Sequence, residues 1–241
     1  MRILITNDDG INAVALPGFV EWAKHLGEVT VVAPKFEQSG KSQAIDFHRS
    51  VEVKRVNDIC GCEAYAMDST PADCVRFAVT GLGRKYDVVF SGINRGYNLG
   101  DDIAYSGTIG AIFESARLGI KAIAFSADVD GYGLALDEIE SVYNYINDNG
   151  ILDQVALLNV NFPSVKSRGI SITRQGGEFY SDEFVYYGDD MYMQVGEPVE
   201  DHCNDTSIDI SAVRLGFVSV TPITAIKTDL VGFDKLKDLN K

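Results

Sequence analysis

The feature that most constrains this fold is an alternation between short apolar runs and helix-like segments through the first two-thirds of the chain. The apolar runs are rich in Val and Ile and have the length of strands, and the segments between them have helical periodicity. This alternation is typical of βαβ units and predicts an α/β fold with three layers around a mostly parallel sheet. The expected strands are 2–6, 28–33, 86–91, 121–126 and 155–162, and the expected helices are 16–26, 71–81, 106–118 and 137–149.

Composition narrows the class of protein. A chain of 241 residues with 46% hydrophobic residues can bury a sizeable core. Its 35 acidic residues outnumber its 21 basic ones and give a net charge of -14, which repels polyanions at long range. We therefore expect neither a nucleic-acid polymer nor an anionic membrane as a partner, whereas a small phosphate ester remains compatible with local positive potential from a metal ion or backbone N–H groups.

Targeting and cysteine signals are weak. The N-terminus resembles neither a secretory signal nor a transit peptide, and no run approaches the ~18 apolar residues of a membrane helix, so a cytoplasmic location is expected. Four cysteines are too few for a disulfide framework at this length, and we expect free, partly buried thiols. A zinc site from Cys60, Cys62 and His202-Cys203 is the less favoured reading because the Cys60–Cys62 spacing is too short for a common zinc knuckle.

The pattern changes after about residue 165, where Gly, Tyr and Asp become frequent and helical cues become few. We expect residues 1–165 to form the catalytic core and residues 166–241 to form a C-terminal extension that ends with a strand at 217–220. The aromatic and acidic stretch 178–192 predicts an extended β-hairpin or arm. Such an arm can pack on a neighbouring subunit, or it can be a surface loop that covers the core. A further strand or hairpin is expected from 50–56 with 64–67.

Polar residues collect where the predicted strands end. In an open parallel sheet, ligands bind outside the carboxyl ends of the strands. Asp8 and Asp9 follow the first strand, Ser39 lies in the long loop after the second, and Asn94 follows the third. Two carboxylates, a hydroxyl and an amide carbonyl are hard ligands that suit Mg²⁺, Mn²⁺ or Ca²⁺ better than zinc. The alternative is that the acidic pair only caps the following helix.

A second polar group opens the helix expected at 106–118. Ser106, Gly107 and Thr108 place two hydroxyls and a glycine at its start, where free N–H groups can hold a phosphate. An ordinary Ser or Thr cap is the simpler alternative. The proposed position beside the metal favours the phosphate interpretation. Asp128 and Asp130 follow the fourth strand at the same edge.

Several of these motifs resemble the SurE family, the stationary-phase survival proteins, which are metal-dependent nucleotidases. They occur in the family's order over most of the chain and are Asn7-Asp8-Asp9-Gly10, Ser39-Gly40, Thr70-Pro71-Ala72-Asp73-Cys74-Val75, Ser91-Gly92-Ile93-Asn94-x-Gly96-x-Asn98-Leu99-Gly100, Tyr105-Ser106-Gly107-Thr108 and Val218-Ser219-Val220-Thr221-Pro222. The resemblance implies a Rossmann-like core, a C-terminal arm exchanged between subunits, and a homodimer or homotetramer.

The resemblance also implies roles for particular residues. Asp8, Asp9, Ser39 and Asn94 match the metal ligands of the family, with one divalent ion, Mg²⁺ or Mn²⁺, in each subunit. The motifs that border the substrate phosphate contain Asn94, Asn98, Ser106, Gly107 and Thr108.

The expected activity is hydrolysis of nucleoside 5′-monophosphates to nucleoside and phosphate, with 3′-monophosphates as further candidate substrates. Asp8 or Asp9 would orient or deprotonate the attacking water, and the sequence does not choose between them. Two alternatives stay open: hydrolysis of polyphosphate or of non-nucleotide phosphates at the same metal, and a nucleotide sensor that binds without turnover.

Overall fold

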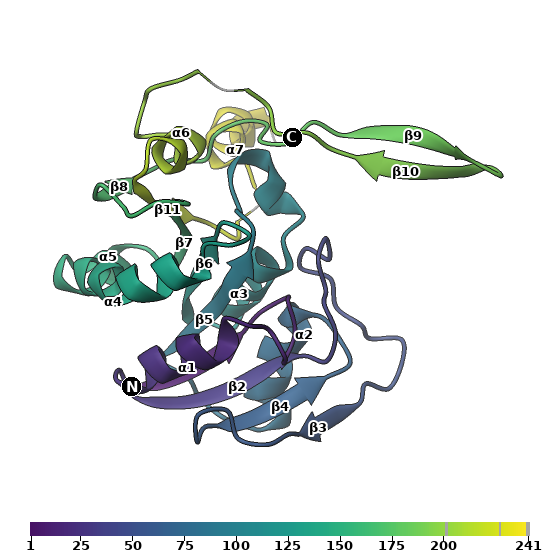
Figure 1. Cartoon of the computed structure of the whole chain (residues 1–241), viewed down its shortest axis with the longest axis vertical. Coiled ribbons are helices and arrows are strands. Elements are labelled where there is room, and N and C mark those ends of the chain that lie inside the picture. The colour runs from purple at the N-terminus through teal and green to yellow at the C-terminus, as the bar shows by residue number, and fades with distance from the viewer. Residues whose placement is uncertain (201, 227, 240–241) are drawn as a thin grey trace.

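The computed structural model describes residues 1–200, 202–226 and 228–239 and shows a three-layer α/β fold (Figure 1). In this described part, nine strands form one sheet in the order β3-β4-β2-β1-β5-β6-β7-β11-β8. All neighbours pair in parallel except β3 with β4 and β7 with β11. The expectation of a mostly parallel sheet between helical layers is confirmed.

The predicted strands are present with small shifts at their ends. The first is matched at both ends, and the third begins later and runs further than expected because its last residues continue to pair with β6 past a register shift. The observed strands are β1 (Arg2–Thr6), β2 (Glu28–Pro34), β3 (Val53–Arg55), β4 (Glu63–Met67), β5 (Val88–Arg95), β6 (Lys121–Ala127), β7 (Leu157–Phe162), β8 (Ile170–Ile172), β9 (Glu183–Gly188), β10 (Met191–Val195) and β11 (Val218–Ile223).

Helices cover both faces of the sheet. Residues of α1 and α4 pack in one apolar cluster with one face, and residues of α2 and α3 pack in a second cluster with the other. The first cluster contains a group of stacked and edge-on rings from Phe19, Trp22, Phe90 and Phe125. The observed helices are α1 (Leu16–Lys24), α2 (Pro71–Arg76), α3 (Gly107–Arg117), α4 (Tyr132–Asp148), α5 (Ile151–Gln154), α6 (Asp209–Arg214) and α7 (Leu230–Leu236).

Two helix predictions need correction. The helix expected at 137–149 begins earlier, at Tyr132, because Gly131 closes a turn on Asp128 and the first turn can start there. The helix expected at 71–81 is regular only to Arg76, and Phe77–Gly81 continue it as a π-helical turn. Thr70 is the N-cap before Pro71 and accepts a hydrogen bond from Asp73 N at 3.2 Å.

The C-terminal part contains more regular structure than its composition suggests. The final strand is confirmed as β11, but it joins the main sheet between β7 and β8, and neither β8 nor α6 nor α7 was expected. These elements are short, so their periodicity is weak in the sequence. The predicted hairpin is β9–β10, and it extends away from the body in Figure 1. The smaller hairpin of β3 with β4 is confirmed as well.

Cys60, Cys62 and Cys74 are free thiols, as expected, with Cys62 and Cys74 buried and Cys60 partly exposed, and Cys203 is partly exposed as well. Within the described ranges, no cluster of three or more His, Cys, Asp or Glu side chains has a metal-binding arrangement. None of the helices in that same part of the chain combines the length and the apolarity needed to cross a membrane.

Candidate active site

The acidic pair lies at the end of β1, where the sheet reverses its strand order. The chain runs outward from β1 to β2 and β4, then returns to β5 on the opposite side of β1. Such a switch point leaves a crevice at the carboxyl ends of the strands. Asn7 shapes the turn there, since its side chain donates to Gly10 O and accepts from Gly10 N, both at 3.0 Å. Gly10 has a φ of 96°, which a residue with a Cβ rarely adopts.

Asp8 is held by the start of helix α3, one hundred residues further along the chain. Its exposed fraction is 4%, and its carboxylate accepts two hydrogen bonds from Thr108: N at 3.0 Å and Oγ1 at 2.7 Å. A Cβ at Gly107 would lie 3.0 Å from Asp8 Cβ and 3.1 Å from Asp8 Oδ2, so glycine permits this approach. The pair does not cap the following helix α1, whose N-cap is Ala15. The capping alternative is therefore excluded.

Asp9 lies in the turn after β1, and Asn94 lies near the end of the neighbouring strand β5. Asp9 Oδ2 accepts from Arg95 N at 3.0 Å, which joins the end of β1 to the end of β5. Asn94 donates to Gly96 O at 2.9 Å, so its amide oxygen points the other way, 3.5 Å from Thr108 Oγ1. Thr108 thus contacts both Asp8 and Asn94, and these side chains present their oxygens in one place.

Ser39 reaches the same edge through the loop between β2 and β3. The residue before it, Gln38, donates its N–H to Asp8 O at 2.7 Å, which fixes the loop against the acidic turn. The Ser39 hydroxyl donates to Glu37 at 2.7 Å. Glu37 is a carboxylate that the sequence interpretation did not single out. Its only signal was its position two residues before Ser39.

The carboxylates repel one another and are poorly solvated. Burial raises the pKa of Asp8 against the hydrogen bonds from Thr108, and the charge of Glu37 adds to the rise. Burial, followed by the charge of Asp8, raises the pKa of Asp9 to about 6. A cation would relieve this repulsion. The donor set of two carboxylates, a hydroxyl and an amide oxygen fits a hard divalent ion, with Asp8, Asp9 and Asn94 already assembled at one edge.

Some of the hydrogen-bonding groups at the start of α3 already have partners within the protein. Ser106 is the N-cap and its Oγ accepts from Ile109 N at 3.2 Å, so the ordinary capping interaction is present. The Thr108 N–H is committed to Asp8. Ser106 keeps a hydroxyl hydrogen, because an oxygen that accepts can still donate.

Asn98 is turned toward the sheet. Its Nδ2 donates to Ser126 Oγ at 2.7 Å and its N–H donates to Asn161 Oδ1 at 2.9 Å. Its backbone carbonyl oxygen accepts hydrogen bonds from the side-chain amides of Asn159 at 2.8 Å and Asn161 at 2.9 Å. This buried network anchors the loop after β5 on β6 and β7. Sequence reasoning missed Asn159 and Asn161, although two Asn on one face of an apolar strand were a visible signal.

Asp128 lies beside Tyr97, and burial, followed by the charge of Asp128, raises the pKa of the Tyr97 phenol to about 12. Asp130 is exposed and its N–H donates to Asp128 at 3.3 Å. Both residues follow β6, where they contact their own turn and Tyr97 rather than the acidic pair.

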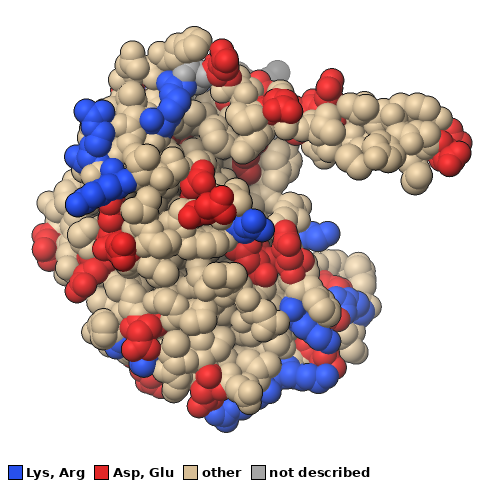
Figure 2. All heavy atoms as spheres, in the orientation of Figure 1, with Lys and Arg blue, Asp and Glu red and all other residues tan. Residues whose placement is uncertain are grey.

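A cavity of about 710 Å³ adjoins the site beside Ser39. It lies between the loops at the edge of the sheet and the base of the β9–β10 hairpin, and Figure 2 shows the hollow beneath the projecting hairpin. Its walls are formed by Ser39, Gly40, Tyr97, Asp102, Tyr105, Tyr180, Asp182, Gln194 and Gly196. A separate cavity of about 700 Å³ lies at the other end of α3, against Arg117. Only the first touches a proposed ligand residue.

Comparisons with known proteins agree on one family. The model of the Survival protein SurE family matches residues 3–182. A relative named 5'-nucleotidase SurE from Natranaerobius thermophilus is 38% identical over 100% of this chain and 98% of its own length. The 5'-nucleotidase SurE 1 of Thermus thermophilus is 40% identical over 93% of this chain and 92% of its own. The crystal structure of the SurE protein from Aquifex aeolicus covers 100% of both chains at 32% identity with a TM-score of 0.84.

Proposed function

The chain belongs to the SurE family, and from that membership we propose that it is a divalent-metal-dependent phosphomonoesterase that hydrolyses nucleoside monophosphates to nucleoside and phosphate. Nucleoside 5′-monophosphates are the main proposed substrates, because the two relatives described above are named 5'-nucleotidases. Hydrolysis of 3′-monophosphates is a further part of the proposal. The observation that supports the phosphomonoesterase proposal is the contact of Thr108 with both Asp8 and Asn94. This contact places hard oxygen ligands next to the start of helix α3.

Asp8, Asp9, Ser39 and Asn94 would hold one ion of Mg²⁺ or Mn²⁺ in each subunit. Such an ion, when bound, neutralises negative charge on the phosphoryl group and lowers the pKa of a water molecule. Thr108 fixes the orientation of Asp8 through two hydrogen bonds, so that this carboxylate is presented without rearrangement. Asp9 or Asp8 takes the proton of the attacking water at a carboxylate oxygen.

The phosphoryl group would be bound next to these side chains. Ser106 offers its hydroxyl hydrogen, Gly107 allows close approach to the backbone at the start of α3, and Asn94 faces the same place. Asn98 has a second amide hydrogen besides the one donated to Ser126. The hydrogens of Ser106 and Asn98 would stabilise the equatorial oxygens as charge develops during in-line displacement, whereas Asn94 presents its amide oxygen there.

The nucleoside part would occupy the cavity beside Ser39. Three of its walls are phenol rings, from Tyr97, Tyr105 and Tyr180, which suit contact with a flat base. The net charge of -14 disfavours long polyanions, so a small nucleotide suits this protein better than polyphosphate.

The β9–β10 hairpin supports a homodimer or homotetramer. It is exposed in a single chain although it carries large apolar side chains, including Phe184 at 71%, Tyr187 at 69% and Tyr192 at 63% exposure. An apolar surface of this kind is typical of protein interfaces. The proposed arm would bury these rings against a second copy of the chain.

A phosphate-release assay tests the function. The purified protein would be treated with chelator, reloaded with Mg²⁺ or Mn²⁺, and offered 5′- and 3′-nucleoside monophosphates, polyphosphate and an aryl phosphate. We expect metal-dependent release from the 5′-monophosphates, abolished by Asp8→Asn and retained by Asp130→Asn, a loss of the same charge at an exposed position. Binding of nucleotides without release in every metal would refute hydrolysis and favour a sensor. Release from polyphosphate alone would assign a different substrate class.

A further inference from the structure

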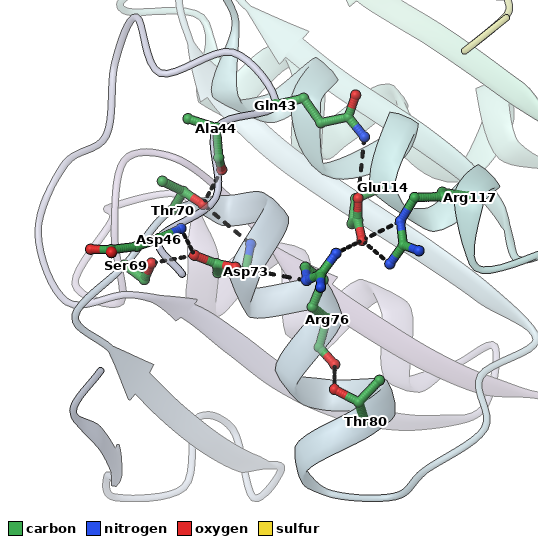
Figure 3. Close-up of polar contacts among 10 residues, drawn as sticks. All are labelled: Gln43, Ala44, Asp46, Ser69, Thr70, Asp73, Arg76, Thr80, Glu114 and Arg117. Atoms are coloured by element: carbon green, nitrogen blue, oxygen red, sulfur yellow. Dashed lines mark hydrogen bonds and ion pairs between the residues drawn. The ribbon is translucent and has the colours of Figure 1, made fainter. Parts of the chain in front are cut away.

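A buried ionic network lies behind the candidate site and is not part of it. Figure 3 shows two carboxylates at its centre, Asp73 near the start of α2 and Glu114 in α3. Both are buried, with Asp73 7% and Glu114 2% exposed. Burial of a carboxylate is unfavourable unless it is paired or hydrogen-bonded. The partners of these two groups therefore show what the network holds together.

Asp73 holds the backbone of the loop that carries Ser39. Its Oδ2 accepts from the Asp46 N–H at 2.7 Å and from the Ser69 hydroxyl at 2.6 Å. Close by, the Thr70 hydroxyl donates to Ala44 O at 2.6 Å. The residues that begin helix α2 thus bind the loop at two successive points.

Glu114 holds the same loop from helix α3. Its Oε2 accepts from Gln43 Nε2 at 3.2 Å. Its Oε1 accepts from Arg76 at 3.1 Å and from Arg117 at 2.9 and 2.6 Å, so its charge is matched by two guanidinium groups. Arg76 also lies 3.9 Å from Asp73, which joins the two carboxylates into one network.

The loop also contacts the residues just before α3 and the first turn of α3 directly. Ser42 donates from its N–H to Tyr105 O at 2.9 Å and from its hydroxyl to Ala104 O at 2.8 Å. A Cβ at Gly110 would lie 2.0 Å from the Ser42 carbonyl oxygen, so the loop and the helix meet backbone to backbone. The loop is therefore attached at residues 42, 43, 44 and 46, immediately after Ser39.

We propose that Asp73 and Glu114 are positioning residues that hold the 38–46 loop on α2 and α3 and thereby set the place of Ser39 relative to Asp8. Ser39 is exposed and, within the described part of the chain, its hydroxyl hydrogen-bonds only to Glu37 of its own loop, so its position depends on how that loop is anchored. Before Ser39 in the chain, the loop is anchored by the hydrogen bond from Gln38 to Asp8. After Ser39, it is anchored by the network around Asp73 and Glu114. The inference rests on the proposed metal site.

Three variants test this. Asp73→Ala removes the acceptor of the Asp46 N–H, and Asp73→Asn keeps an acceptor oxygen and serves as the conservative rescue. Gln43→Met has a similar length, lies at a partly exposed position and removes only the Glu114 contact, so it stays informative if Asp73→Ala folds poorly. Glu138→Ala is the matched control, because Glu138 also accepts from a backbone N–H, that of Ser167 at 2.9 Å, on helix α4.

Two readouts separate positioning from general stability. Amide hydrogen exchange of residues 36–47 is measured in protein treated with chelator, and the Mn²⁺ dissociation constant is measured by titration. Asp73→Ala should exchange faster in this segment and bind Mn²⁺ about tenfold more weakly, the effect of one lost hydrogen bond to a charged group. Gln43→Met should show the same changes to a smaller extent, and Asp73→Asn should approach the wild type. At saturating Mn²⁺, kcat should return to within about twofold of the wild-type value, because bound metal holds Ser39 in place.

A merely structural role predicts a different result. If Asp73→Ala lowers the melting temperature but leaves both Mn²⁺ affinity and exchange of 36–47 unchanged, the inference is wrong. It is equally wrong if Glu138→Ala weakens Mn²⁺ binding as much. A wild-type protein that binds Mn²⁺ but hydrolyses no phosphate ester refutes the proposed function alone, whereas failure of the variants in an active wild-type background refutes only the positioning role.

Discussion

Replacing Asp9 with Asn should stabilise the protein in the absence of metal while it abolishes metal-dependent hydrolysis. The pKa of Asp9 is raised from 3.8 to about 6 by burial and by the charge of Asp8. A carboxyl whose pKa is raised in the folded state favours folding when protonated and loses that advantage as the pH rises through the folded pKa. Near pH 7.5, ionised Asp9 therefore opposes folding, and a neutral amide does not.

The expected gain in stability follows from the size of the pKa shift of Asp9. About two pKa units correspond to about 3 kcal/mol at 1.36 kcal/mol per unit. Residual solvent access and the extra amide donors of Asn reduce this, so we expect a gain of about 1–2 kcal/mol. For a chain of this length that is a rise in melting temperature of about 2–8 °C. Asn can still accept from Arg95 N, so the hydrogen bond at the end of β5 is kept.

Thermal and urea denaturation of both proteins between pH 4 and 8, with chelator present, would measure this gain. The advantage of Asp9→Asn should be full above pH 6 and shrink toward pH 4, where Asp9 is protonated in the folded wild type. Adding Mn²⁺ should stabilise the wild type and leave the variant unchanged. Asp130→Asn, at an exposed position, should show neither effect. A variant that is less stable than the wild type at pH 7.5 in chelator, or a difference that does not change with pH, would refute the reasoning.

Further predictions concern the helix start, the loop contact, the metal and the arm. Thr108→Val keeps the shape of the side chain but removes the hydroxyl that contacts Asp8, and kcat should fall about tenfold or more, as expected for a lost charge-assisted hydrogen bond. Thr108→Ser should recover most of the lost kcat, and equal kcat in both variants would contradict a role for this hydroxyl. Gly110→Ala places a Cβ 2.0 Å from Ser42 O and should cost about 1–3 kcal/mol of unfolding free energy in urea; an unchanged midpoint would show that the loop moves freely. Chelator should stop phosphate release, Mg²⁺ or Mn²⁺ should restore it, and activity that survives chelation would exclude the proposed ligand set. Tyr187→Ser, at an exposed position of the hairpin, should lower the mass found by light scattering with little change in melting at low concentration; an unchanged mass would exclude the arm from assembly.

Local sequence patterns were enough to predict the fold class and most of the sheet. Periods of two and 3.6 residues are local properties, so they identify strands and helices wherever the elements are long enough. The first strand was predicted to the residue, whereas the short elements α6, α7 and β8 were missed. The sequence also indicated that Asp8, Asp9 and Asn94 follow strands whose ends share one edge.

How these residues meet depends instead on contacts between elements that are distant in the sequence. No local pattern relates Asp8 to Thr108, because their contact depends on the packing of α3 on β5 and β6, one hundred residues further along the chain. The same is true of Asn98 with Asn161, and of Asp73 with the loop that carries Ser39. Side-chain identity states which chemistry is available, but distance, burial and the choice of hydrogen-bond partner arise only when separate elements pack. The pKa of Asp9 is raised for this reason, since burial by packed neighbours is its largest cause.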